Sequence, residues 1–154
     1  MSQDDSMGHA AAWRFVVNSL AARAQSVAEI EAKLAARGVP ADVAAPVVDE
    51  ASRLGYLDDA ELAGQLARGH RWRGYGRRRA EAELRRRGLG EADVAAALEE
   101  AYGDTDEVVL ARAALGSRTT ADAKAERRAI AFLVRRGFSP GAAWAVVRER
   151  RDRA

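Results

Sequence analysis

Hydrophobic residues recur along this chain at the three- and four-residue spacing of amphipathic helices. In the segment 10–23, for example, Trp13, Val16, Val17 and Leu20 fall on one face of a helix. No stretch keeps up the two-residue alternation that is typical of a half-buried strand. The pattern therefore predicts an all-α protein of nine short helices.

A motif of a leucine, a basic cluster and a glycine occurs three times. Its copies are 34–38, 84–88 and 133–137, so the glycines lie 50 and then 49 residues apart. Repetition at this period is typical of a modular array, whose units bury their apolar faces mainly against neighbours. We predict three tandem three-helix repeats that form an elongated, curved array. The expected boundaries are a flexible N-terminal tail over 1–9 and repeats over 10–56, 57–103 and 104–154.

Capping signals mark where several of these helices begin and end. The segment 26–29 has the form of a capping box, and Asp58 stands where an N-cap is wanted. Gly38 is expected just past the end of a helix, where the left-handed conformation is common. Pro46 is discordant, because inside a helix it removes one hydrogen bond and should kink the helix.

Composition narrows the functions that need to be considered. The chain has 154 residues and no cysteine, which excludes disulfides, thiolate metal sites and a thiol nucleophile. It has no glycine-rich phosphate loop, no zinc-ligand set and no serine–histidine–acid arrangement. No apolar run approaches the ~18 to 20 residues that a membrane span needs. We therefore predict a cytoplasmic protein that is not an enzyme and has no catalytic residues, metal site or cofactor.

The net charge of +2 hides a strong segregation of charge along the chain. The segment 68–87 holds nine arginines and only two acidic residues, whereas 91–107 holds seven acidic residues and no basic one. A basic block of this kind is typical of a surface that binds polyphosphate, and acidic blocks can face a basic protein partner.

The Gly74-Tyr75-Gly76 element inside the basic block is the main candidate binding site. The glycines predict a bend with accessible backbone amides, followed by arginines at the start of a helix, and both features attract anions. A phosphate backbone and an acidic protein surface satisfy this pattern equally. The alternative is structural, with helix-ending glycines, a packed Tyr75 and solvated arginines. The residues expected to bind a partner or DNA are Arg73, Tyr75, Arg77, Arg78, Arg79, Arg85 and Arg86.

Each predicted repeat contains one tryptophan. These are Trp13, Trp72 and Trp144, and Trp72 lies in the basic block, where it could stack on a base. A buried position in a helical core is the favoured interpretation for all three.

Two motifs follow one another in the middle of the chain. The first is Leu54-Gly55-Tyr56-Leu57-Asp58-Asp59-Ala60-Glu61-Leu62-Ala63; the second combines Gly74-Tyr75-Gly76-Arg77-Arg78-Arg79 with Glu83-Leu84-Arg85-Arg86-Arg87-Gly88-Leu89. Together with the outer segments 26–38 and 132–138, they resemble the RecX family of regulatory proteins, over residues 13–150.

This resemblance implies a non-enzymatic protein of tandem three-helix units that binds the filament of the RecA recombinase. Such a protein lodges in the helical groove of the filament and inhibits ATPase and strand exchange. The resemblance also implies a monomer that acts in homologous recombination, DNA repair and the SOS response. Single- or double-stranded DNA would then be contacted through the filament.

Two other interpretations stay open at the level of sequence. A helical-repeat protein could hold DNA directly through the segment 68–87 without a recombinase, and its affinity would then fall steeply with salt. A purely scaffolding interaction module is the third possibility.

Overall fold

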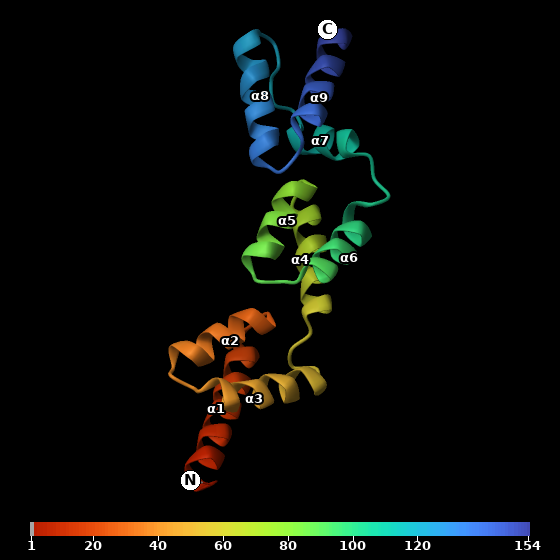
Figure 1. Cartoon of the computed structure of the whole chain (residues 1–154). Helices are drawn as coiled ribbons and strands as arrows, with labels where there is room; N and C mark the ends of the chain where they lie inside the picture. The colour runs from red at the N-terminus through yellow and green to blue at the C-terminus, as the bar shows by residue number, and fades with distance from the viewer. Residues whose placement is uncertain (1) are drawn as a thin grey trace.

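The computed structural model describes residues 2–154, and the side chains from residue 8 onward. Within this part of the chain every regular element is an α-helix, and nine helices stack into an elongated body with the termini at opposite ends (Figure 1). Their bounds are α1 Ser2–Ala22, α2 Val27–Ala36, α3 Ala41–Arg53, α4 Asp59–Trp72, α5 Arg77–Arg86, α6 Glu91–Tyr102, α7 Glu107–Leu115, α8 Ala123–Arg135 and α9 Pro140–Arg153. The all-α prediction is confirmed.

The helices form three repeats, α1–α3, α4–α6 and α7–α9, and each repeat has its own hydrophobic core. The leucine of the repeated motif is fully buried in each core, at Leu34, Leu84 and Leu133. Leu110 on α7 packs against the cores of both the second and the third repeat. The predicted array of three tandem three-helix repeats is therefore confirmed.

The finer repeat boundaries stay predictions. Leu57, which was assigned to the second repeat, packs in the core of the first. The bounds of α1 reach into the segment 1–9, where we expected a flexible tail. Because the side chains of residues 1–7 lie outside the described residues, that expectation is not tested.

The predicted capping signals work as expected. At the start of α2, Ser26 Oγ accepts a hydrogen bond from the Glu29 amide (3.1 Å), and the Glu29 carboxylate accepts one from the Ser26 amide (3.0 Å). The Asp58 side chain caps α4 by accepting from the Glu61 amide (3.1 Å). Pro46 lies inside α3, which continues on both sides of it.

The first and second repeats meet where α5 ends. Ser26 Oγ donates a hydrogen bond to the Arg87 carbonyl (2.5 Å), and the Arg87 guanidinium pairs with Glu29 (3.0 Å). Burial raises the pKa of Glu29, but hydrogen bonds from Arg87 and from the Ser26 backbone outweigh it, so the net effect lowers this pKa. Gly88 lies so close to α2 that a Cβ there would be 2.6 Å from the Ala28 Cβ.

The second and third repeats meet in the same way where α8 ends. The Gly76 amide donates to the Arg136 carbonyl (2.7 Å), and the Arg78 amide donates to the Gly137 carbonyl (3.1 Å). A Cβ on Gly137 would lie 2.5 Å from the Arg79 Cβ. At both junctions, therefore, the end of one middle helix docks on the start of the middle helix in the preceding repeat.

The middle helices α8, α5 and α2 consequently follow one another head to tail along the array (Figure 1). This order places the partly negative C-terminal end of one helix dipole against the partly positive N-terminal end of the next, which is favourable. Gly88 and Gly137 have left-handed φ values of 80° and 100° and also no space for a Cβ. The glycine of the repeated motif is thus required by the junction as well as by the helix end.

Substitution of these glycines tests the junction directly. Gly38 has a similar φ of 78° but nothing within 4 Å of its added Cβ, so it is a matched control for Gly88. We expect Gly38→Ala to lower the free energy of unfolding by about 1 kcal/mol through backbone strain alone. Gly88→Ala should lose a further 1–3 kcal/mol, roughly, because its methyl group overpacks α2. Urea unfolding followed by circular dichroism measures both, and equal losses would contradict the docked junction.

Candidate functional site

The loop between α4 and α5 lies at the junction of the second and third repeats. The Tyr75 ring in this loop is flanked by the guanidinium groups of Arg79 (3.9 Å to the ring centroid) and Arg136 (4.7 Å). The Tyr102 hydroxyl donates a hydrogen bond to the Tyr75 carbonyl (2.8 Å), and the buried His70 ring lies 5.4 Å from the Tyr75 ring. Tyr75 therefore holds the junction together, as the structural interpretation of the loop expected.

The expectation of accessible backbone amides after this loop is wrong for two of them. The Gly76 and Arg78 amides donate to the carbonyls of Arg136 and Gly137 in the third repeat, so they are occupied within the chain. Nothing in the sequence near the start of α5 indicates that carbonyls of the third repeat will accept hydrogen bonds from its amides. Attraction of an anion here has to come from the arginine side chains.

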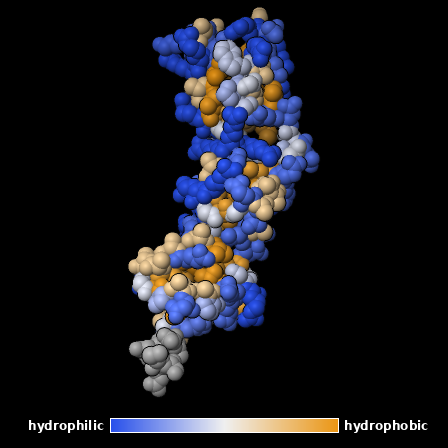
Figure 2. All heavy atoms as spheres, in the orientation of Figure 1, coloured by the Kyte–Doolittle hydropathy of each residue, from blue (hydrophilic) through white to orange (hydrophobic). Residues whose placement is uncertain are grey.

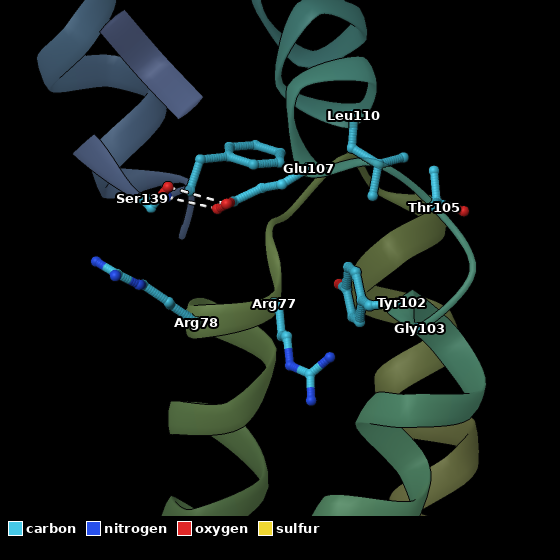
Figure 3. Close-up of a pocket in the computed structure, with 9 residues that line it drawn as sticks. Arg77, Arg78, Tyr102, Gly103, Thr105, Glu107, Leu110 and Ser139 are labelled. Atoms are coloured by element: carbon cyan, nitrogen blue, oxygen red, sulfur yellow. Dashed lines mark hydrogen bonds between the residues drawn. The ribbon is translucent and has the colours of Figure 1, made fainter. Parts of the chain in front are cut away.

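A cavity of about 320 Å³ opens beside the start of α5, between the second and third repeats (Figure 3). At the edge of this cavity, the side chains of Arg77 and Arg78 point in different directions from the start of α5. Tyr102 and Leu110 contribute apolar surface to its wall. Glu107 also lines it, but its carboxylate already accepts hydrogen bonds from the Ser139 amide (2.6 Å) and hydroxyl (2.9 Å). Arg78 is exposed, and no carboxylate among the described residues lies within ion-pairing distance of it.

The predicted binding residues divide into two groups. The arginines near the junction have weak or no carboxylate partners. Arg77 lies 4.0 Å from Glu99. Arg73 lies 3.3 Å from His70 Nδ1, and Arg79 stacks on Tyr75. Those at the other end of α5 are paired within the chain, Arg85 with Glu81 (2.9 Å) and Glu91 (3.2 Å), and Arg86 with Glu83 (2.6 Å). The structure thus brings Arg73, Tyr75, Arg77, Arg78 and Arg79 together and leaves Arg85 and Arg86 apart from them.

Titration of two groups reflects these contacts. The hydrogen bond from Arg86 lowers the pKa of Glu83, so this carboxylate stays ionised and keeps its partner. Burial lowers the pKa of His70, and the nearby charge of Arg73 acts in the same direction, so the imidazole beside Tyr75 is neutral at physiological pH.

The tryptophan prediction is wrong for Trp72, whose side chain is 90% exposed. The buried face of α4 includes Ala63, and nine residues later a helix of about 3.6 residues per turn places Trp72 on the opposite face. Trp144 is also 44% exposed, whereas Trp13 packs against the first core with its ring 5.9 Å from that of Tyr56.

Two arginines that make contacts between repeats were not among the predicted binding residues. Arg136 stacks on Tyr75, and Arg87 pairs with Glu29 across the first junction. A signal for both was present in the sequence, because each stands directly before the glycine of the repeated motif, as Arg37 does in the first repeat.

Among the side chains that the structure describes, from residue 8 onward, no three His, Cys, Asp or Glu gather in a way that could hold a metal ion. None of the described helices combines the length and the apolar character needed to cross a membrane.

Comparison with known proteins gives one consistent family. Residues 12–50 match the model of the first three-helix domain of RecX, and residues 58–98 match that of the second. The chain is 34% identical over 143 residues to regulatory protein RecX of Mycobacteroides abscessus, covering 89% of this chain and 70% of the relative. It is 37% identical over 139 residues to regulatory protein RecX of Mycolicibacterium vanbaalenii, covering 83% and 76%.

Solved structures of RecX share the fold. The crystal structure of RecX from Lactobacillus salivarius superimposes with a TM-score of 0.72 at 20% identity and covers 97% of each chain. A second crystal structure of regulatory protein RecX gives a TM-score of 0.77 at 20% identity, covering 90% of this chain and 72% of that one.

The Tyr102 hydroxyl provides a test of the cavity wall. Tyr102→Phe removes its hydrogen bond to the Tyr75 carbonyl, and we expect the free energy of unfolding to fall by about 1 kcal/mol at neutral pH. Burial raises the pKa of Tyr102 to about 12, so the folded state keeps a proton that the unfolded chain loses above about pH 10. Wild-type stability should therefore decline as the pH rises from about 10 to about 12.

The free energy of unfolding of Tyr102→Phe should not show the contribution of this tyrosine to the decline above about pH 10. Below about pH 10, it should change with pH in the same way as that of the wild type. Urea unfolding across the alkaline range measures the effect in both proteins. An identical decline in the two would show that the Tyr102 hydroxyl is not buried in the folded protein.

Proposed function

This chain belongs to the RecX family of regulatory proteins, and on that premise we propose that it regulates the RecA recombinase. In this proposal it binds the RecA nucleoprotein filament in the helical groove and inhibits ATPase and strand exchange. It acts as a monomer and not as an enzyme, in the cytoplasm, in homologous recombination, DNA repair and the SOS response.

The observation that carries the proposal is the exposed Arg77–Arg78 pair at a junction between repeats. An array of repeated units presents an extended surface, which suits a partner that is itself long and periodic. Arg78 and Arg77 stand at the cavity where two repeats meet, with Arg78 lacking a carboxylate partner in the described chain. Exposed guanidinium groups without a close carboxylate partner are suited to bind carboxylates of a protein surface or phosphates within a filament.

The other predicted arginines support this assignment in different ways. Arg73 is exposed and adjoins the same loop, whereas Arg79 and Tyr75 hold the junction that positions the cavity. Arg85 and Arg86 have exposed ion pairs, which contribute little to stability and can exchange for a partner's carboxylates. We propose Arg77 and Arg78 as the main contacts and Arg85 and Arg86 as secondary ones.

The single-stranded-DNA-dependent ATPase of the cognate RecA tests the proposal. Titration with this protein should inhibit the ATPase at a small fraction of the recombinase concentration, and excess free DNA should not relieve the inhibition. Inhibition that falls in proportion to added DNA would instead favour the alternative, a helical-repeat protein that binds DNA without a recombinase partner. No inhibition at any ratio would contradict the regulatory proposal.

A pair of double variants tests the residues. We expect Arg77→Ala/Arg78→Ala to retain the helical circular dichroism of the wild type and to weaken ATPase inhibition severalfold, because both side chains are exposed and make no short ion pair. Arg85→Ala/Arg86→Ala also removes two positive charges from α5, and it should weaken ATPase inhibition less. Unchanged inhibition by the first variant would place the contact surface elsewhere on the array.

A further inference from the structure

His70 is a buried histidine in the last turn of α4, next to the loop that carries the candidate site. It is only 8% exposed, and its ring lies 5.4 Å from the ring of Tyr75. Tyr75 in turn contacts Arg79 and Arg136 at the junction of the second and third repeats. A change in the charge of His70 therefore acts directly on the residues that form this junction.

Two neighbours compete for one nitrogen of the His70 ring. Nδ1 lies 3.1 Å from the Leu66 carbonyl oxygen and 3.3 Å from Arg73 Nη2. A carbonyl oxygen can only accept a hydrogen bond, and a guanidinium group can only donate one. Nδ1 therefore donates to Leu66 when it carries a proton and accepts from Arg73 when it does not. The two hydrogen bonds exclude each other, so the proton on Nδ1 decides whether Arg73 is held.

Charged or titratable side chains face this histidine and Tyr75 from each neighbouring part of the fold. They are Arg73 directly after α4, Arg79 and Glu83 on α5, Tyr102 on α6 and Arg136 at the end of α8. Burial is the main cause that lowers the pKa of His70 below its ordinary value of 6.5, the Leu66 carbonyl opposes it, and the charge of Arg73 acts with burial. At neutral pH the ring is therefore uncharged and able to accept a hydrogen bond from Arg73.

Arg73 also lines a hollow of about 330 Å³ at the same junction. Arg71 and Arg136 are the other basic residues of its wall, and no acidic residue of the described chain lines it. Hydrophilic residues gather over the second and third repeats, in the upper half of Figure 2. A partner's carboxylate that enters this hollow forms a charged pair with Arg73, and such a pair is stronger than a hydrogen bond to a neutral imidazole. Arg73 is then drawn away from His70.

We propose that His70 is a proton-linked positioning residue: when a carboxylate of the partner binds the Arg73 guanidinium, His70 Nδ1 gains a proton from water and donates to the Leu66 carbonyl instead. The proposal rests on the regulatory function proposed above, since the partner is the RecA filament, and adds the regulation of that site. Because binding takes up a proton, the affinity for the partner rises as the pH falls. By the same reciprocity, a bound partner makes His70 easier to protonate.

NMR titration of the free protein tests the contact between His70 and Arg73. The chain has only two histidines, His9 and His70, so their ring signals can be followed separately. Arg73→Ala should raise the pKa of His70 toward 6.5, because the hydrogen-bond donor and its charge are both removed. Arg68→Ala is the matched control, since this arginine of α4 lies 3.0 Å from Glu100 and should leave the pKa of His70 unchanged. Identical titration of His70 in the wild type and in Arg73→Ala would overturn the proposal.

The pH dependence of ATPase inhibition tests the coupling to the partner. Between about pH 7.5 and about pH 6, where a histidine titrates, the concentration of wild-type protein that half-inhibits RecA should fall by about fivefold, the lower end of coupling between two sites. His70→Asn should lose this dependence, because its amide oxygen can accept from Arg73 but does not titrate. Both proteins are measured on the same RecA filaments, so the pH response of RecA itself cancels in the comparison.

Calorimetry gives a second readout that needs no His70 variant. Binding of the wild-type protein to RecA filaments at about pH 6.5, measured in two buffers of different ionisation enthalpy, should show net proton uptake. Arg73→Ala, whose substituted side chain is exposed, is expected to fold and to take up fewer protons. Equal proton uptake by the two proteins would contradict the coupling.

The outcomes separate the coupling from the function on which it rests. Inhibition with the same pH dependence in the wild type and in His70→Asn would overturn the coupling and leave the proposed function standing. No inhibition by the wild-type protein at any pH would overturn both.

Discussion

The architecture depends on one contact that occurs twice, the docking of a glycine turn on the start of a helix. The end of α5 docks on α2 through Arg87 and Gly88, and the end of α8 docks on α5 through Arg136 and Gly137. Each repeat has its own core. The arrangement of the repeats along the array therefore depends on these small polar junctions and on Leu110, which packs against two of the cores. Head-to-tail helix dipoles favour the same arrangement.

The second junction also creates the surfaces to which we assign function. Because the Gly76 and Arg78 amides are used for docking, the anion binding that we propose falls to the arginine side chains. It places Arg136 against Tyr75 and brings Arg77 and Arg78 to the edge of a cavity shared by two repeats. A change in the junction is therefore a change in the binding surface, which links the stability of the array to its proposed activity.

The sequence was sufficient for the fold, because the relevant signals act over a few residues. Helical spacing, the capping box at Ser26 and the leucine–glycine motif each depend on near neighbours. Such local signals do not predict contacts between repeats, such as the hydrogen bond from the Gly76 amide to a carbonyl in the next repeat. The exposure of Trp72 follows from its position opposite the buried Ala63 on α4, and this position overrides the general tendency of tryptophan to be buried.

Site-specific photo-crosslinking tests the central claim, that the surface at the second junction faces an assembled filament. A photo-reactive amino acid would replace Arg78, and in a parallel protein it would replace the exposed Arg53 of the first repeat. The account predicts crosslinks from position 78 to RecA when RecA is assembled on single-stranded DNA, and few from position 53 or with unassembled RecA. Equal crosslinking of position 78 to single-stranded DNA in the absence of RecA, or equal crosslinking from both positions, would contradict it.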